Sequence, residues 1–337
     1  MKKIFFRSYS VILMALALSC STTTNDEIIN EETGENWEHL QLPVNEPSQL
    51  SGTYNALGYG YNVLGSYANE NSVASKIIDT DKFKIEQAQR LSEENILSQE
   101  YKEEYGENAA AFSKMLSTKV SATEQFSVFG QTIPFTTAIL SNKKYDPNYI
   151  YGSYNLIIKQ KRYRINTDSE LLSNYLTADF SKDIEEKSPE QIVKTYGTHV
   201  AVDIYTGSAF DIIFQAKTTN SNRESAARAG VKTAVNGMSN GTDAAEASKN
   251  YAKKLFYKTR GGDKSLATAG IYNLEKITPV LNYSNWQSSS TKENSVLVDF
   301  GNNGLISIYD LVKDPAKKAE LKTYIDQYLK ENQVSLE

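Results

Sequence analysis

Histidine is the side chain best suited to acid–base chemistry near neutral pH and to metal binding, and the chain contains only two. One of them, His199, lies in the stretch KTYGTHVAVDIYTGSAF at residues 194–210. A catalytic histidine needs a nucleophile or an orienting acid beside it, and a zinc ligand needs partners at a characteristic spacing. The sequence has no HExxH motif and no glycine-rich phosphate loop, and its single cysteine, Cys20, stands near the N-terminus. We therefore expect no enzyme and no metal or cofactor site.

The same stretch fits a structural corner between a helix and a strand. Ser188 and Pro189 are typical of a helix cap and of the first helical turn that follows it. Gly197 suits a helix end with positive φ, where Thr198 and His199 would bond to nearby backbone groups. We therefore expect the histidine to hold a turn.

Hydrophobic periodicity predicts the elements that position this corner. Four-residue spacing of Leu97, Tyr101 and Tyr105 predicts an exposed amphipathic helix within the charged segment 83–105. Alternation of apolar and polar residues over 112–128 predicts a long strand with one apolar side. The remaining assignments are strands at 149–165, 209–216 and 253–260, helices at 169–180 and 183–194, apolar core runs within 295–308, and a helix that starts at Asp314–Pro315.

The N-terminus is typical of an export signal followed by a tether. Three basic residues precede the apolar run Val11–Leu18, which is shorter than the roughly 20 residues that cross a bilayer. Cys20 closes the run and resembles the lipidated cysteine of a bacterial lipobox; ordinary secretion with an incidental cysteine is the alternative. Removal of residues 1–19, with their three positive charges, changes the net charge from −5 to −8. Residues 20–49 are acidic and lack apolar periodicity, so we expect a flexible tether that includes the second histidine, His39.

The composition of the remaining chain narrows the class of protein. The residues after about position 50 suffice for one large domain and contain no second helix-length apolar run, so we expect no transmembrane helix. A net acidic chain with scattered Lys and Arg is a poor nucleic-acid binder. The 22 tyrosines and only 7 prolines favour ordered β structure over disorder.

The corner also resembles the signature of the membrane attack complex/perforin (MACPF) superfamily. The matching residues are Tyr196, Gly197, Thr198, His199 and Gly207, while Val200 and Ser208 replace the second aromatic residue and the second glycine of the signature. Three further stretches resemble the family in the same order: LGYGYNVLGSY at 57–67, TRGGD at 259–263, and Trp286 followed by VLVDFGNNGLISIYDL at 296–311. The resemblance spans about residues 50–311.

This resemblance implies an α+β fold of the MACPF/CDC type, in which two helical clusters flank a bent, twisted four-stranded antiparallel sheet. The clusters would lie at about Asp79–Phe112 and Thr218–Leu255, and Gly261 and Gly262 would form a hinge in a later strand. The MACPF-like domain would run from 50 to 312, and residues 313–337 would form a C-terminal helix packed on it.

The resemblance also implies a function. In the family, each helical cluster unwinds into a β-hairpin, and many copies join their hairpins into a membrane barrel. The implied partners are a target membrane, recognised through its lipid or an outer-membrane receptor, and further copies of the chain. The lipoprotein signal and the fold together resemble the Bacteroidales secreted antimicrobial proteins, which kill related cells. The leading expectation is an antibacterial, pore-forming lipoprotein of a Gram-negative outer membrane, exposed at the cell surface or released in vesicles.

A non-lytic surface adhesin that keeps the fold is the second hypothesis. Residues 227–235 alternate as a lipid-facing strand should, but Glu93 and Asn95 would face lipid in the first cluster. A charge near the bilayer midplane costs about 2–4 kcal/mol for Lys or Arg and less for Glu, so the helices could instead stay folded. In the adhesin, four tyrosines would stack on glycans: Tyr54, Tyr59, Tyr61 and Tyr67. The alternative is that they are half-buried strand residues.

Overall fold

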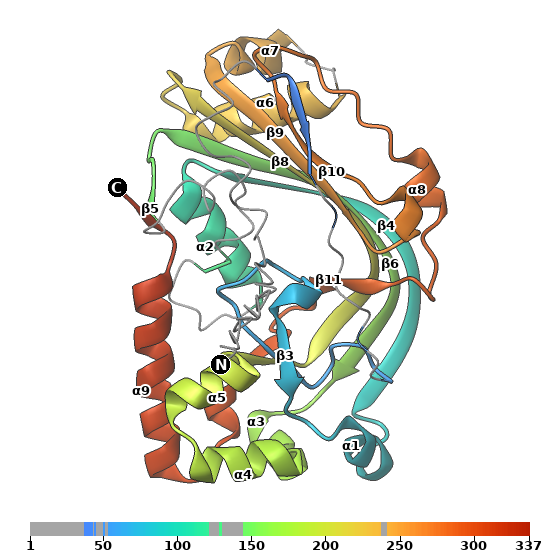
Figure 1. Cartoon of the computed structure of the whole chain (residues 1–337), viewed down its shortest axis with the longest axis vertical. Helices are drawn as coiled ribbons and strands as arrows, with labels where there is room; N and C mark the ends of the chain where they lie inside the picture. Colours follow the sequence, from blue (N-terminus) through green and yellow to red (C-terminus); the bar gives the residue numbers. More distant parts are fainter. Residues whose placement is uncertain are drawn as a thin grey trace, which may run out of the picture.

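A bent antiparallel sheet forms the centre of the molecule. The computed structural model describes residues 37–42, 44, 50, 53–120, 128–129, 144–236 and 241–337. The strands of the sheet follow the order β1-β10-β9-β8-β6-β4, with β11 beside β8. Its four long strands, which curve together as one band in Figure 1, are β4 (Leu91–Gly106), β6 (Tyr149–Ile165), β8 (Asp203–Thr218) and β9 (Asn250–Arg260). The predicted bent sheet with four long antiparallel strands is therefore confirmed.

Shorter elements complete the main sheet and build a second one. β1 (His39–Gln41) and β10 (Ala269–Asn273) extend the sheet beyond β9, and β11 (Val296–Phe300) pairs with the first residues of β8. The second sheet has the order β12-β7-β2-β3. Its strands are β2 (Tyr59–Tyr61), β3 (Val73–Lys76), β7 (His199–Ala201) and β12 (Leu305–Ser307). β5 (Lys144–Tyr145) and β13 (Ser335–Leu336) form a separate parallel pair.

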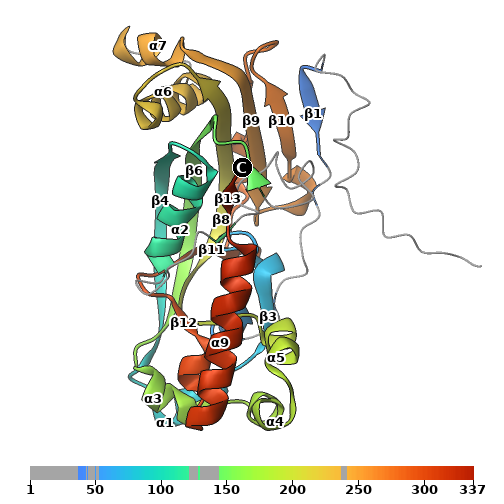
Figure 2. The ribbon, with the colours of Figure 1, turned by 90° about the vertical axis from the view of Figure 1, so that its left-hand side faces the viewer.

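Most helices gather at the end of the molecule that carries the second sheet, in the lower half of Figures 1 and 2. They are α1 (Thr80–Glu86), α3 (Ser169–Leu172), α4 (Ala178–Glu186), α5 (Pro189–Tyr196) and the C-terminal α9 (Pro315–Asn332), while the short α8 (Ser284–Ser288) lies beside the main sheet. α9 begins at the predicted site, because the Asp314 carboxylate accepts a hydrogen bond from the Lys317 backbone N–H. Its buried residues Leu321, Ile325 and Leu329 face the core shared with the second sheet.

Two connections between long strands place helices on opposite faces of the main sheet. α2 (Ala109–Val120) lies between β4 and β6 in sequence, and α6 (Arg223–Asn236) and α7 (Gly241–Ala247) lie between β8 and β9. The ring of Tyr151 on β6 lies 6.3 Å from that of Phe112 on α2. The next residue, Gly152, faces α6 instead, since a Cβ atom there would lie 3.1 Å from the Ala227 carbonyl. Successive strand residues point to opposite faces, so α2 covers the concave face of the bend and α6 the other.

The bend is produced by irregularities at one level of neighbouring strands. The register shifts between Asn95 and Ser98 in β4, and between Lys159 and Lys161 in β6. Ser98 is the partner of Lys159, which is in turn the partner of Gly207 on β8. A further shift follows in β11 just after Leu297, which pairs with Thr206, the residue before Gly207. An extra residue in a strand bends it and increases its twist, so these shifts together curve the whole sheet.

Two predicted elements have the wrong type. The segment 83–105, predicted as a helix, is mainly strand β4, and the segment 112–128, predicted as a strand, contains helix α2 up to Val120; residues 121–127 lie outside the described ranges. Both errors have the same cause. Residues four apart share one face of a helix and also one face of a strand, so the spacing of Leu97, Tyr101 and Tyr105 fits either type.

The first helical cluster is consequently displaced along the chain. It was expected at Asp79–Phe112, but that range holds the short α1, strand β4 and only the first four residues of α2, which is the helix on the sheet. The second cluster, expected at Thr218–Leu255, contains α6 and α7. The predicted helix at 169–180 is broken into α3, a 3₁₀ turn and the start of α4, because Thr177 caps a new helix through the Phe180 backbone N–H.

Part of the expected tether is ordered. Residues 39–41 form β1 on the edge of the main sheet, although 20–49 was expected to be flexible. The backbone of a three-residue strand is satisfied by a partner more than 200 residues away, which local sequence patterns do not reveal. The expected signal at 1–19 and the lipidation site Cys20 lie outside the described residues and remain predictions.

Candidate functional site

The corner predicted from sequence is a tight junction between α5 and β7. Ser188 forms a capping box with Gln191 at the start of α5, and Gly197 ends the helix with φ 73°. A Cβ atom at Gly197 would lie 2.6 Å from the Tyr61 carbonyl group, so only glycine fits against β2. The Thr198 backbone N–H donates to the same Tyr61 oxygen at 3.0 Å. The corner therefore fastens α5 to the second sheet.

His199 is a buried structural residue in this corner. Its side chain is 1% exposed, and burial lowers its pKa to about 4, so the ring is neutral at physiological pH. Nδ1 lies 2.9 Å from the Thr198 hydroxyl, and Nε2 lies 3.2 Å from the hydroxyl of Ser307, its partner on β12. A serine–histidine catalytic pair needs a carboxylate behind the imidazole, and a threonine hydroxyl takes that position here. The contacts join β7 to β12.

Gly207 and the predicted hinge glycines meet at the bend. Gly261 and Gly262 follow β9 with φ values of 65° and 75°. A Cβ atom at Gly261 would lie 2.7 Å from the Gly207 carbonyl oxygen, and one at Gly207 would lie 1.8 Å from the Ile158 carbonyl oxygen. The indole N–H of the buried Trp286 donates to the Gly261 carbonyl at 2.8 Å. Two glycine motifs that are about 50 residues apart in sequence thus form one close-packed glycine junction.

A buried cluster of charges lies beside this junction on the concave face. Its centre is Asp299 of β11, whose side chain is 2% exposed and which accepts a hydrogen bond from the Tyr67 hydroxyl at 2.9 Å. Lys102 of β4 pairs with the Asp299 carboxylate, and Lys159 of β6 lies 3.0 Å from it. Burial alone would raise the pKa of Asp299, but the two ammonium groups lower it below its usual value. We call these four residues the Asp299 cluster; it joins three strands at the bend.

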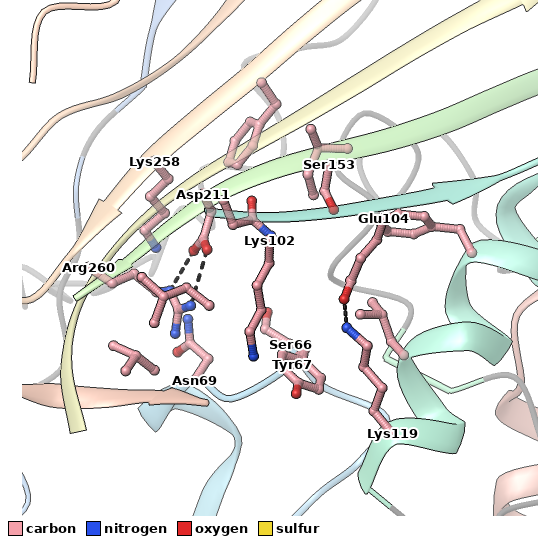
Figure 3. A pocket seen from close by; sticks show the side chains of 17 residues that line it. Ser66, Tyr67, Asn69, Lys102, Glu104, Lys119, Ser153, Asp211, Lys258 and Arg260 are labelled. Carbon is pink, nitrogen blue, oxygen red and sulfur yellow. Dashed lines mark hydrogen bonds and ion pairs between the residues drawn. The ribbon is translucent and has the colours of Figure 1, made fainter. Parts of the chain in front are cut away.

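A cavity of about 170 Å³ opens between the Asp299 cluster, the concave face and α2. Figure 3 shows charged side chains from several elements around it. Arg260 of β9 forms a two-pronged pair with Asp211 of β8, at 2.5 and 3.2 Å, and donates to the Leu297 carbonyl at 3.0 Å. On the opposite wall, Lys119 of α2 pairs with Glu104 of β4. The ion pair with Glu104 is thus a contact that holds α2 against the sheet.

On the other face, α6 packs against the sheet through small side chains. Its buried residues are Ala226, Ala227, Ala229, Gly230 and Val231. The Asn250 side chain donates to the Ala226 carbonyl at 2.9 Å, and Arg223 donates to the Glu107 and Pro147 carbonyls at 2.9 and 2.7 Å. A helix that buries mostly alanine loses less hydrophobic stabilisation on leaving a surface than one that buries leucine or phenylalanine. Polar contacts at its N-terminal end therefore contribute much of what holds α6 in place.

The sequence prediction separated residues that the fold brings together. It marked the corner and the glycine motifs but gave no sign that Gly207 and Gly261 touch. It missed the Asp299 cluster, whose three charged members look like ordinary charged residues of separate segments. The tyrosines that would bind glycans in the adhesin hypothesis do not form a common surface, because Tyr61 is fully buried and Tyr67 packs edge-on against Phe129 and Phe300. Those tyrosines fit the alternative reading, as partly or fully buried residues.

The described residues contain neither a candidate metal site nor a candidate membrane-spanning helix. No three His, Cys, Asp or Glu side chains in these ranges are placed to hold a metal ion. Within the same ranges, every helix is too short or too polar to cross a bilayer.

Known proteins resemble this chain over most of its length. The sequence pattern of the MAC/Perforin domain covers residues 47–337. GNIP1Aa from Chromobacterium piscinae is 16% identical with a TM-score of 0.62, and the alignment covers 84% of this chain and 57% of that chain. A candidate cell invasion protein with a MAC/Perforin domain from Bacteroides thetaiotaomicron is 16% identical with a TM-score of 0.66, covering 87% and 65%. The chain thus spans less than two thirds of either protein, and at this identity the likeness concerns the fold. No curated protein sequence matches the chain.

Proposed function

The chain belongs to the MAC/Perforin domain family, and from that premise we propose that it is a pore-forming protein. The α2 and α6–α7 connections refold into membrane-crossing β-hairpins as copies of the chain assemble. The observation that carries this proposal is their position, because each connection joins the ends of two adjacent long strands of the bent sheet. If the helices unwind, β4 and β6 lengthen into one hairpin, and β8 and β9 lengthen into the other.

Both connections are long enough for such hairpins. They comprise residues 107–148 and 219–249, and two crossing strands of about 9–11 residues each, with a turn, need fewer. Backbone groups within lipid must all be hydrogen-bonded, and hairpins that extend an existing sheet and pair with those of neighbouring copies satisfy this condition.

The sequence of both helices is compatible with a strand that faces lipid on one side. In α2, Phe112, Leu116 and Val120 are buried and would share one face of a strand, on which Lys114 would be the charged exception. These residues share a face in a helix and also in a strand, which is the ambiguity that led to the strand prediction. In α6, Ala227, Ala229 and Val231 would lie on one face of a strand and the charged Arg228 and Lys232 on the other. The displacement of the first cluster to α2 also takes Glu93 and Asn95 out of the proposed hairpin, because both belong to β4.

The remaining features of the proposal rest on the sequence. The chain is a non-enzymatic, antibacterial toxin, anchored through lipidated Cys20 in the outer membrane of a Gram-negative bacterium, at its surface or in released vesicles. Its partners are other copies of itself and a target membrane, recognised through lipid or a receptor. The non-lytic adhesin is the outcome in which the chain binds cells and forms no pore.

A disulfide between α6 and the sheet tests the proposal. A Cβ atom built at Gly152 lies 3.3 Å from the Val231 Cβ, close to the 3.5–4.5 Å found in disulfides. We expect the Gly152→Cys/Val231→Cys chain, with Cys20→Ser, to release dye from vesicles of Gram-negative outer-membrane lipid when reduced and to release none when oxidised. The reduced form is the matched control. Equal release in both redox states would exclude refolding of α6, and binding of the wild-type chain without release would favour the adhesin.

A further inference from the structure

The cavity between α2 and the concave face of the sheet is large enough for a small ligand. Its volume of about 170 Å³ is more than five times the roughly 30 Å³ that one water molecule occupies in the liquid. A group of about five non-hydrogen atoms therefore fits in it. The side chains of Lys102 and Lys119 are 30% and 36% exposed, so the cavity is open to water on their side.

The lining of this cavity carries an excess of positive charge. Four cationic and two acidic side chains line it: Lys102, Lys119, Lys258, Arg260, Glu104 and Asp211. Beside them, Asp299, Glu100 and Lys159 add two acids and one lysine, which leaves one positive charge in excess. The whole chain has a net charge of −5, so the sign of this cavity is opposite to that of the protein. The cavity therefore favours an anionic ligand.

The Lys119 ammonium group would be stabilised by such an anion. Burial and, next, the nearby Lys102 ammonium lower the pKa of Lys119 to about 8 from its ordinary 10.5, even though Glu104 pairs with it. The negative charge present is thus too small to offset burial. An anion bound beside Lys119 would favour its charged form and raise its pKa again.

A buried hydroxyl group also points to a polar ligand. The Ser153 side chain of β6 is 1% exposed, and its Oγ has no hydrogen-bond partner among the described residues. Buried hydroxyl groups are almost always hydrogen-bonded, because leaving one unsatisfied is costly. Ser153 lines the cavity opposite Glu104 in the register of β6 and β4, and Figure 3 shows it beside the same space as Lys102 and Lys119. A ligand oxygen in the cavity would accept its hydrogen bond.

The donors of the cavity fit a phosphate group better than a carboxylate. A planar carboxylate is matched by the two-pronged guanidinium group of arginine, but Arg260 already forms that pair with Asp211. Lys102, Lys119 and Ser153 instead offer single donors from three different elements. Single donors from several directions suit the tetrahedral oxygens of phosphate, which lysine binds as a point charge.

We propose that this cavity binds one phosphate group, with Lys102 and Lys119 as the charged donors and Ser153 as the hydroxyl donor. Lys119 lies on α2, whereas Lys102 and Ser153 lie on the sheet, so the bound phosphate bridges α2 to the concave face. Binding is independent of the proposed function. Its consequence rests on that function: because α2 refolds in the proposed pore, bound phosphate slows insertion. The phosphate group is either free in solution or part of a lipid headgroup.

Calorimetric titration of the full chain with inorganic phosphate at pH 7 tests the site, with acetate at the same ionic strength for comparison. We expect one phosphate to bind per chain, and acetate to bind at least about tenfold more weakly. Ser153→Ala should weaken phosphate binding about tenfold, the effect of one hydrogen bond to a charged group, and Lys119→Met at least as much. No binding of phosphate to the wild type, or equal affinity for phosphate and acetate, would overturn the proposal.

Ser113→Ala is the matched control for Ser153→Ala. Ser113 lies on α2, is fully buried and also has a hydroxyl without a partner among the described residues, but it is not part of the cavity lining. Without phosphate, neither alanine variant should lower the urea midpoint, because each removes an unsatisfied polar group. Only Ser113→Ala should keep the phosphate affinity of the wild type. Equal phosphate affinity in the two variants would contradict the role of Ser153.

Hydrogen exchange of the α2 amides measures the bridge between α2 and the sheet. At a phosphate concentration of about ten times its dissociation constant, exchange should slow about tenfold in the wild type and much less in Ser153→Ala at the same concentration. Unchanged exchange in the wild type, with phosphate bound, would overturn the bridge.

Vesicles distinguish the two sources of phosphate. Cosedimentation with phosphatidic acid vesicles that is weakened by Ser153→Ala and displaced by inorganic phosphate would identify a lipid headgroup as the ligand. Binding of inorganic phosphate, with no preference for phosphatidic acid over phosphatidylcholine vesicles, would identify free phosphate. Binding to neither would overturn the site.

These outcomes are distinguishable from failure of the pore. A wild-type chain that binds phosphate but never releases dye from vesicles would refute pore formation and leave the phosphate site standing. Dye release at the same rate with and without bound phosphate would refute the effect on insertion and leave the pore standing.

Discussion

Asp299→Asn should destabilise the protein by about 3 kcal/mol, although it changes one carboxylate oxygen into an amide nitrogen. The substitution conserves volume, so the loss comes from charge and not from a cavity. It leaves Lys102 and Lys159 facing a neutral group in a site where the aspartate side chain is 2% exposed, with Glu100 as their remaining acidic partner. Removing one partner of a buried ion pair costs about 3–5 kcal/mol. We expect the lower end of this range because the Lys102 side chain is 30% exposed and can reach water.

Urea unfolding at pH 7 measures this loss as a change in the free energy of unfolding. The matched control is Asp310→Asn, whose carboxylate is 39% exposed and pairs with Lys318 at 3.1 Å. A surface pair of this kind contributes about 0–1 kcal/mol. Adding Lys159→Met to Asp299→Asn should cost less than the sum of the two single losses, because Asp299 and Lys159 contact each other at 3.0 Å. A loss below 1 kcal/mol, or a double variant that is simply additive, would refute the reasoning.

The Asp299 carboxylate should also make the stability of the protein fall as the pH is lowered. The pKa of Asp299 is lower in the folded protein than in the unfolded chain, so its ionisation stabilises the fold fully above the unfolded pKa of about 3.9. That contribution is lost as pH falls further, through the folded pKa. The Asn variant should lack this part of the acid-induced loss.

Three more predictions concern the corner and the bend. His199→Asn should remove a pH dependence of stability. Burial lowers the pKa of His199 to about 4 in the folded protein, from about 6.5 in the unfolded chain, so the unfolded chain binds the proton more readily. Between pH 7 and pH 4, the free energy of unfolding measured with urea should therefore fall by about 3 kcal/mol more in the wild type than in the variant. Gly197→Ala should cost about 1–3 kcal/mol, because φ is 73° and the new methyl group would clash with the Tyr61 carbonyl; an unchanged midpoint in thermal unfolding would contradict the strained geometry. Leu97→Gly should stabilise the fold by about 0.5–1 kcal/mol, since the exposed leucine has φ 50°, and a lower melting temperature would show that its side chain contributes to packing.

The sequence predicted most accurately those elements whose residue pattern fits only one type of secondary structure. The strand at 149–165 was predicted with its observed bounds, because a long run rich in Tyr, Ile and Leu, without helix caps, suits a strand buried on both faces. The start of α5 was predicted from Ser188 and Pro189, since capping is a local interaction. By contrast, β4 and α2 exchanged types because four-residue spacing fits both periods.

The Asp299 cluster, strand β1 and the glycine junction depend on contacts between residues far apart in the sequence, which local sequence patterns do not indicate. Asp299 is nearly 200 residues from Lys102 along the chain, and nothing in either neighbourhood indicates that they pair. The short β1 was taken for tether because its backbone partners lie more than 200 residues further on. Gly207 and Gly261 were each marked as special, but only the paired register of β8 and β9 shows that they are one junction.

The row of register shifts across β4, β6 and β11 has a mechanical consequence. A single strand cannot be straightened while its neighbours keep their extra residues, because each strand's pairing fixes the path of the next. Flattening of the curve would then be an all-or-none event that involves several strands at once, with few stable states between the curved and the flat form. The curvature of the sheet would therefore change cooperatively between two states and would not vary continuously.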